Sequence, residues 1–184
     1  STLSTGLSIN GGTVDRVGIR AFGDDDFMRR GLVTTGSGVT VKNSAISGGG
    51  IAQGYGIYNI GHELNVYDTT FEHPVQPYEN EHYGIYSTGT LFGRRLKFIG
   101  ERSAITFAGT QMEIYDSLFD MGAAESAVTV NAGAVDGSFL LHGVTVVGNA
   151  SNQVAVRLIG STHQKSGDIR DSLFDLNGAG STEM

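Results

Sequence analysis

The sequence predicts an all-β fold, a right-handed single-stranded parallel β-helix of about six to seven coils. Two short sequence patterns alternate along the chain, and the last residue of the first pattern returns every 21 to 28 residues. Within both patterns apolar residues occupy every second position, which is typical of a strand with one buried face. No segment keeps the helical period of about 3.6 residues. A repeat of this length is typical of a solenoid, in which each repeat forms one structural unit.

The first pattern is an apolar residue, any residue, Asp or Asn, two further residues and a second apolar residue. Asp and Asn tolerate left-handed backbone and hydrogen-bond their own main chain, so we expect a bend between two strands at that position. The clear copies are Val41–Ile46, Val66–Phe71, Ile114–Phe119 and Ile169–Phe174, and the degenerate copies are Val14–Ile19, Gly93–Phe98 and Leu141–Val146.

The second pattern, an apolar residue followed four positions later by Gly, lies between successive copies of the first. The glycines are Gly36, Gly61, Gly89, Gly109 and Gly160, and Ala132 takes this place in an imperfect copy. We expect these glycines to provide a positive φ at the next corner. The segment Leu7–Gly11 also matches before the first full repeat, which predicts that the chain begins in mid-coil.

Coils of this kind stack about 4.8 Å apart, so equivalent residues of successive repeats should form ladders. The ladder that closes the first pattern would fill the core with Ile19, Ile46, Phe71, Phe98, Phe119, Val146 and Phe174. We expect residues 1–184 to form a single domain. Because the chain lacks an initiating Met, we also expect it to be a fragment of a longer chain with flanking domains.

The composition narrows the function classes. With 12 Lys and Arg against 19 Asp and Glu, the formal net charge is −7, which disfavours binding to nucleic acid phosphates. The absence of Cys excludes disulfides and thiolate metal sites. No apolar run of about 18 residues is present, so no membrane association is expected. We expect no cofactor and no metal, because three consecutive carboxylates such as Asp24–Asp26 cannot all face one Ca²⁺ ion in an extended chain.

The Val-x-Asp-x-x-Phe and Ile-Tyr-x-x-Gly coils resemble the pectate-lyase-like β-helix superfamily, and are most similar to its phage tailspike and fibre segments. The resemblance covers nearly the whole chain and concerns architecture, which does not by itself give a function. It implies a homotrimer that recognises, and sometimes cleaves, surface polysaccharide. The catalytic sets of the lyases do not map onto this sequence, and Glu72-His73-Pro74 departs from the Asp-Pro-His-Glu motif of mannuronan epimerases.

Two long connections, residues 20–30 and 72–83, are separated by a shorter Gly-rich one. Solenoids place insertions on one face, so these two segments would form the walls of a groove. If the protein is a glycoside hydrolase or polysaccharide lyase, the candidate catalytic carboxylates are Asp24, Asp26, Glu79 and Glu81. The alternative is that these acidic loops are solvated turns.

The candidate ligand-binding residues combine aromatic rings with basic and imidazole groups. They are Phe27, Arg29, Tyr58, His73, Tyr78, His82, Tyr83 and Tyr86. His73 and His82 could form an acid/base or ligand pair, or could simply pack. Arg94 and Arg95, beside Lys97, could bind an anionic sugar or phosphate, but we expect them to pair with acidic residues in adjacent coils.

One column of the second strand should face outward. It reads Val33, Tyr58, Tyr86, Thr106, Thr129 and Arg157. A face this apolar favours lateral packing into a homo-oligomer, expected to be a trimer, with a sugar platform at Tyr58 and Tyr86 as the second possibility and a free face as the third.

The sequence therefore favours a carbohydrate-recognising or structural β-helix segment of a trimeric virion tailspike, fibre or surface protein. Its expected partners are further copies of the chain, a polysaccharide or surface glycan, and flanking domains. We expect it on a virion, outside the cell or at the cell surface. Two alternatives remain open: a polysaccharide-degrading enzyme, and a purely structural spacer or capsid-decorating protein.

Overall fold

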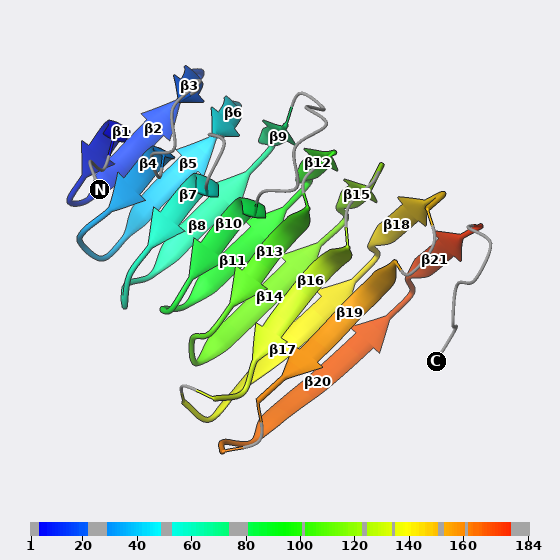
Figure 1. Ribbon diagram of the computed structural model, residues 1–184. Helices are drawn as coiled ribbons and strands as arrows, with labels where there is room; N and C mark the ends of the chain where they lie inside the picture. The colour runs from blue at the N-terminus through cyan, green and yellow to red at the C-terminus, as the bar shows by residue number, and fades with distance from the viewer. Residues whose placement is uncertain are drawn as a thin grey trace.

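The protein is a parallel β-solenoid, which confirms the predicted all-β class. The computed structural model describes residues 4–21, 29–48, 53–73, 81–100, 102–122, 125–133, 135–150, 153–160 and 162–177. Within these ranges the chain forms strands β1 to β21 and no helix. Figure 1 shows the coils stacked side by side in the order of the sequence.

The strands form three parallel sheets of seven strands, and each coil contributes one strand to every sheet. The solenoid has about five turns that are stacked on both sides, fewer than the six to seven coils that the repeats predict, and the outer group of three strands at each end has one neighbour. The first sheet contains β1 (Ser4–Ile9), β4 (Arg29–Thr34), β7 (Gln53–Asn59), β10 (Glu81–Ser87), β13 (Ser103–Phe107), β16 (Ser126–Asn131) and β19 (Val154–Ile159). The second contains β2 (Gly12–Asp15), β5 (Val39–Lys42), β8 (Leu64–Tyr67), β11 (Leu91–Arg94), β14 (Gln111–Tyr115), β17 (Gly137–His142) and β20 (Lys165–Arg170). The third contains β3 (Gly18–Ala21), β6 (Ala45–Gly48), β9 (Thr70–Glu72), β12 (Lys97–Ile99), β15 (Leu118–Asp120), β18 (Thr145–Gly148) and β21 (Leu173–Leu176).

The core consists of ladders of like residues from successive coils. Phe71, Phe98 and Phe119 stack ring on ring, with centroids 4.7 and 5.0 Å apart. The other predicted core residues of this ladder, from Ile19 to Val146, are also buried. Phe174 occupies the same column but is 37% exposed, because β21 is an edge strand.

The corner between the second and third sheets has a left-handed backbone conformation in every coil, as the first pattern predicts. Its φ values lie between 48° and 64° at Arg16, Asn43, Asp68, Arg95, Asp116, Gly143 and Asp171. The arginines at two of these positions show that the stacked coils impose this conformation even where Asp and Asn are replaced.

A Ser or Thr follows the corner in several coils and ties adjacent coils together. The Ser117 hydroxyl donates to the Tyr115 carbonyl at 2.7 Å and accepts the Leu96 N–H at 3.0 Å. Ser44 and Ser172 make the equivalent pair of bonds. These hydroxyls therefore satisfy backbone N–H groups that lie outside the regular strand pairing.

The glycines of the second pattern have two different structural roles. Gly61 and Gly160 have φ values of 72° and 88°, as predicted. The prediction is wrong for Gly36, Gly89 and Gly109, which do not have a positive φ in the structure. A Cβ atom at Gly89 would lie 2.0 Å from the His62 carbonyl oxygen, so close approach of the neighbouring coil requires glycine there.

Candidate functional site

Some of the predicted site residues lie in the part of the chain that the structure describes, and others lie outside it. Tyr58, Tyr83, Tyr86, His82 and Arg29 lie on β4, β7 and β10 of the first sheet, and His73 follows β9. Glu81 is the first residue of β10. The remaining predicted site residues, Asp24, Asp26, Phe27, Tyr78 and Glu79, lie outside the described residues. The groove and the enzyme hypothesis built on these carboxylates therefore stay predictions.

Four tyrosines form one aromatic cluster on the first sheet. Tyr55 stacks on Tyr83 with centroids 5.2 Å apart, and Tyr58 stacks on Tyr86 at the same separation. Tyr55 also contacts Tyr58 edge-on at 5.0 Å, which joins the two stacks. Tyr55 is buried, whereas the other three rings are partly exposed. The three partly exposed rings thus form an aromatic surface that packs on the buried ring of Tyr55.

The sequence reasoning overlooked Tyr55, although a signal was present. The tetrapeptide Tyr-Gly-Ile-Tyr occurs twice, at residues 55–58 and 83–86, and the two copies are in exact register on β7 and β10. Residues three apart face opposite sides of a flat strand, so the contact of Tyr55 with Tyr58 means that β7 is not flat between them. The pairing of β7 with β10 is interrupted at this point, because Gly56 and Gly84 have no partner in the register. Glycine is required at this position, because a Cβ on Gly56 would lie 2.6 Å from the Gly84 carbonyl oxygen of the adjacent strand.

Polar groups border the tyrosine cluster on both sides. The guanidinium of Arg30 lies over the Tyr58 ring, 3.7 Å from its centroid, in a cation–π contact. On the opposite side the register continues from Tyr83 to Ser103 and from Tyr86 to Thr106. The predicted column exists, because Val33, Tyr58, Tyr86, Thr106, Thr129 and Arg157 are in register across six strands. It is only partly exposed, because Val33 and Thr129 are buried.

His73 and His82 lie together, but their rings stack face to face. The ring centroids are 3.8 Å apart with an interplanar angle of 22°. Burial of His82, helped by the nearby positive charges of His73 and Arg102, lowers its pKa to about 4. His82 is therefore neutral at neutral pH. Among the described residues no group of three or more His, Asp or Glu side chains could hold a metal ion.

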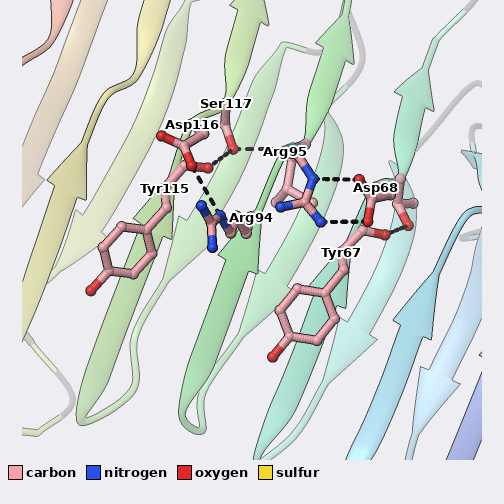
Figure 2. Close-up of polar contacts among 9 residues, drawn as sticks. Tyr67, Asp68, Arg94, Arg95, Tyr115, Asp116 and Ser117 are labelled. Carbon is pink, nitrogen blue, oxygen red and sulfur yellow. Dashed lines mark hydrogen bonds and ion pairs between the residues drawn. The ribbon is translucent and has the colours of Figure 1, made fainter.

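Arg94 and Arg95 pair with acidic residues of adjacent coils, as predicted. Arg95 binds Asp68 through two nitrogens, at 2.6 and 2.7 Å, and Arg94 Nε lies 2.9 Å from Asp116 Oδ2. Figure 2 shows both pairs at the corner between the second and third sheets, with Arg94 and Arg95 reaching from one coil to the two coils on either side. Hydrogen bonding to Arg95 also lowers the pKa of Asp68. All four side chains are substantially exposed, so each pair contributes little to stability.

Comparison with known proteins gives no relative of this chain. No family model matches it, and neither a curated protein nor a solved structure does so. No helix in the described ranges is long and apolar enough to cross a membrane. The described site is thus a tyrosine cluster on one face of a parallel β-solenoid.

Proposed function

We propose that this chain is a carbohydrate-recognising, right-handed β-helix segment of a trimeric virion tailspike, fibre or surface protein. The observation that carries the proposal is the double stack of tyrosines on β7 and β10. The apolar face of a sugar ring packs on an aromatic ring, and the phenol hydroxyl can hydrogen-bond to sugar hydroxyls. Core packing alone does not explain the repeated Tyr-Gly-Ile-Tyr segment, because three of the four tyrosine rings in its two copies are partly exposed.

The geometry of the cluster supports binding of an extended glycan. Stacking along the solenoid axis fixes the rings of Tyr58 and Tyr86, so little side-chain freedom would be lost on binding. Arg30 at one side and the hydroxyl of Thr106 at the other could donate hydrogen bonds to sugar oxygens.

The right-handed path and the trimer are further parts of the proposal. Connections between parallel strands of one sheet are right-handed in about 98% of proteins. Leu158 and Ile159 on the edge strand β19 are 60% and 41% exposed. Apolar side chains and unpaired backbone groups at such an edge favour contact with another chain or with a flanking segment.

Glycan binding by tyrosine variants tests the proposal. Tyr58→Ala and Tyr86→Ala should each weaken binding in a glycan screen and in calorimetry about tenfold or more, which corresponds to a loss of about 1.4 kcal/mol. Thr13→Ala, an exposed position of β2 on the second sheet, is the matched control and should bind like the wild type. Absence of binding to any glycan, or equal binding by all three variants, would refute carbohydrate recognition at the cluster. Light scattering decides the assembly, because a trimer supports the proposal and a monomer contradicts it.

A further inference from the structure

A second concave surface lies on the second sheet, which does not contain the tyrosine cluster. It is an open groove of about 380 Å³, lined by Asn65, Tyr67, Phe92, Gly93, Arg94 and Tyr115. These residues belong to three adjacent strands, β8, β11 and β14. The volume falls within the range of about 300–1,000 Å³ that is usual for small-molecule sites.

Two tyrosines form the sides of this groove. Tyr67, Arg94 and Tyr115 are in register on the three strands, so the two tyrosines are separated by two strand spacings, about 9.6 Å. Figure 2 shows both rings extending toward the same end of their strands, on either side of Arg94. A flat ring placed between them needs a contact distance of about 3.5–4.0 Å on each side. The spacing is therefore sufficient for one sugar ring.

Hydrogen bonds fix both tyrosines before any ligand binds. The Tyr67 hydroxyl donates to Asn65 Oδ1 at 3.3 Å, and the Tyr115 hydroxyl donates to Glu113 Oε2 at 2.8 Å. Glu113 is itself held by Gln111 at 2.7 Å. The bond to Glu113 also raises the pKa of the Tyr115 phenol. Such preorganisation lowers the entropic cost of binding.

The central strand provides an aromatic residue that core packing does not explain. Phe92 occupies an outward column, in register with the polar residues Asn65 and Glu113, and remains partly exposed. Gly93 beside it contributes only backbone to the groove, because Leu96 occupies the space where its side chain would lie. Together with the rings of Tyr67 and Tyr115 in the same groove, Phe92 forms a contiguous aromatic patch, which is typical of a binding surface.

Among the described lining residues Arg94 alone is charged, and the carboxylate of Glu113, which is bonded to Tyr115, lies beside the groove. The Arg94 Nε donates to Asp116 at 2.9 Å, and its side chain is 55% exposed. A guanidinium carries five N–H donors, so one bond to Asp116 leaves donors for a carboxylate ligand. Arg95, by contrast, uses both Nε and one terminal nitrogen on Asp68 and does not line the groove.

We infer that this groove binds a carboxylate-bearing pyranose, a uronic acid unit of an acidic glycan. The sugar ring lies between Tyr67 and Tyr115 over Phe92, and its carboxylate meets Arg94. This inference rests on the proposed carbohydrate recognition but assigns a separate site with its own charge preference.

Calorimetry with short oligogalacturonides, and with galactose oligomers of matched length as the neutral probe, tests the assignment. Arg94→Gln and Tyr67→Ala should each weaken oligogalacturonide binding about tenfold or more, whereas Arg95→Gln, the matched control, should stay within about twofold of the wild type. Resonances of Tyr67 and Tyr115 in ¹³C-tyrosine-labelled protein, assigned from Tyr→Phe variants, should shift on titration. Circular dichroism verifies that each variant is folded.

Three outcomes would overturn the inference. The first is a wild-type chain that does not bind oligogalacturonides or binds the neutral oligomers equally well. The second is an unchanged affinity in Arg94→Gln and Tyr67→Ala, and the third is an equal loss in Arg95→Gln. The proposed function is judged separately by Tyr58→Ala and Tyr86→Ala, so it can survive when the groove assignment fails.

Discussion

Gly93 and Leu96 reverse the order of small and large residues that the neighbouring coils have at these two positions. Gly93 stands where the adjacent coils have a large residue, and Leu96 stands where they have a small one. A Cβ atom on Gly93 would lie 2.7 Å from Leu96 Cδ1 and equally close to Ile114 Cδ1. In the adjacent coils the equivalent pairs combine a large with a small residue, Val66 with Thr69 and Ile114 with Ser117. In the coil that contains Gly93, the side chain of Leu96 at the corner therefore fills the core volume that Val66 and Ile114 fill in the adjacent coils.

This exchange predicts strong coupling between the two positions. Gly93→Val should destabilise the protein by roughly 1–3 kcal/mol through overpacking, and Leu96→Ser by roughly 2–5 kcal/mol through loss of buried volume. The double variant, which restores the arrangement of the adjacent coils, should lose clearly less than the sum. Urea denaturation of the four proteins gives the coupling energy. Additive losses would contradict the volume exchange.

The stacked phenylalanines predict different effects at two Phe positions one strand apart. Phe98→Ala should cost about 3–5 kcal/mol, because it removes a fully buried ring between Phe71 and Phe119. Phe92→Ala on the outer face is the matched control and should cost much less. Thermal unfolding measures both, and similar losses would place Phe92 in the core instead of in the groove.

The Ser ladder predicts a cost that depends on burial. Ser117→Ala leaves the buried Leu96 N–H without its acceptor, which should cost about 1–3 kcal/mol. Ser172→Ala removes the same bond from Val144, but Ser172 is partly exposed, so water can replace the hydroxyl and the loss should be smaller. Equal denaturation midpoints for the two variants would argue against this role of the hydroxyls.

The left-handed corner predicts residue-specific tolerance at Asp68, where φ is 48°. Asp68→Asn should cost at most about 1 kcal/mol, since Asn tolerates this backbone and only an exposed ion pair is lost. Asp68→Val should cost roughly 1–2 kcal/mol more, because a Cβ-branched residue is strained there. Asp120→Val, in strand β15, controls for the substitution itself and should be nearly neutral in urea unfolding. A similar loss in Asp68→Asn and Asp68→Val would refute backbone strain as the cause.

The buried imidazole of His82 predicts acid destabilisation. Its folded pKa of about 4 lies below the ordinary value of about 6.5 for a histidine, so the unfolded state binds more protons between these pH values. Stability should therefore decrease as the pH falls from about 6.5 to 4, by at most on the order of 3 kcal/mol. Denaturant midpoints measured across this range should vary less in His82→Gln than in the wild type. The same pH dependence in both proteins would exclude His82 as its source.

Local sequence patterns predicted the corners and the core, but not the aromatic surfaces. Asn43 and Asp116 stand at bends because their side chains favour left-handed backbone, and that preference is local. Gly89 looked equivalent to Gly61, yet its role depends on a carbonyl group that a different coil brings within van der Waals distance. Tyr55 was overlooked because strict alternation places it opposite Tyr58, whereas in the structure the two rings are in contact across the break in pairing at Gly56.

The sequence by itself determined the solenoid, the corner positions and the inward ladders, because a repeated pattern with period two specifies which residues a coil buries. Tertiary structure decided which side chains meet across coils, since the register between strands separated by 20 or more residues is set by stacking. That register creates the tyrosine cluster on the first sheet and the Tyr67–Tyr115 groove on the second. Both surfaces arise between coils, where no single repeat contains the whole arrangement.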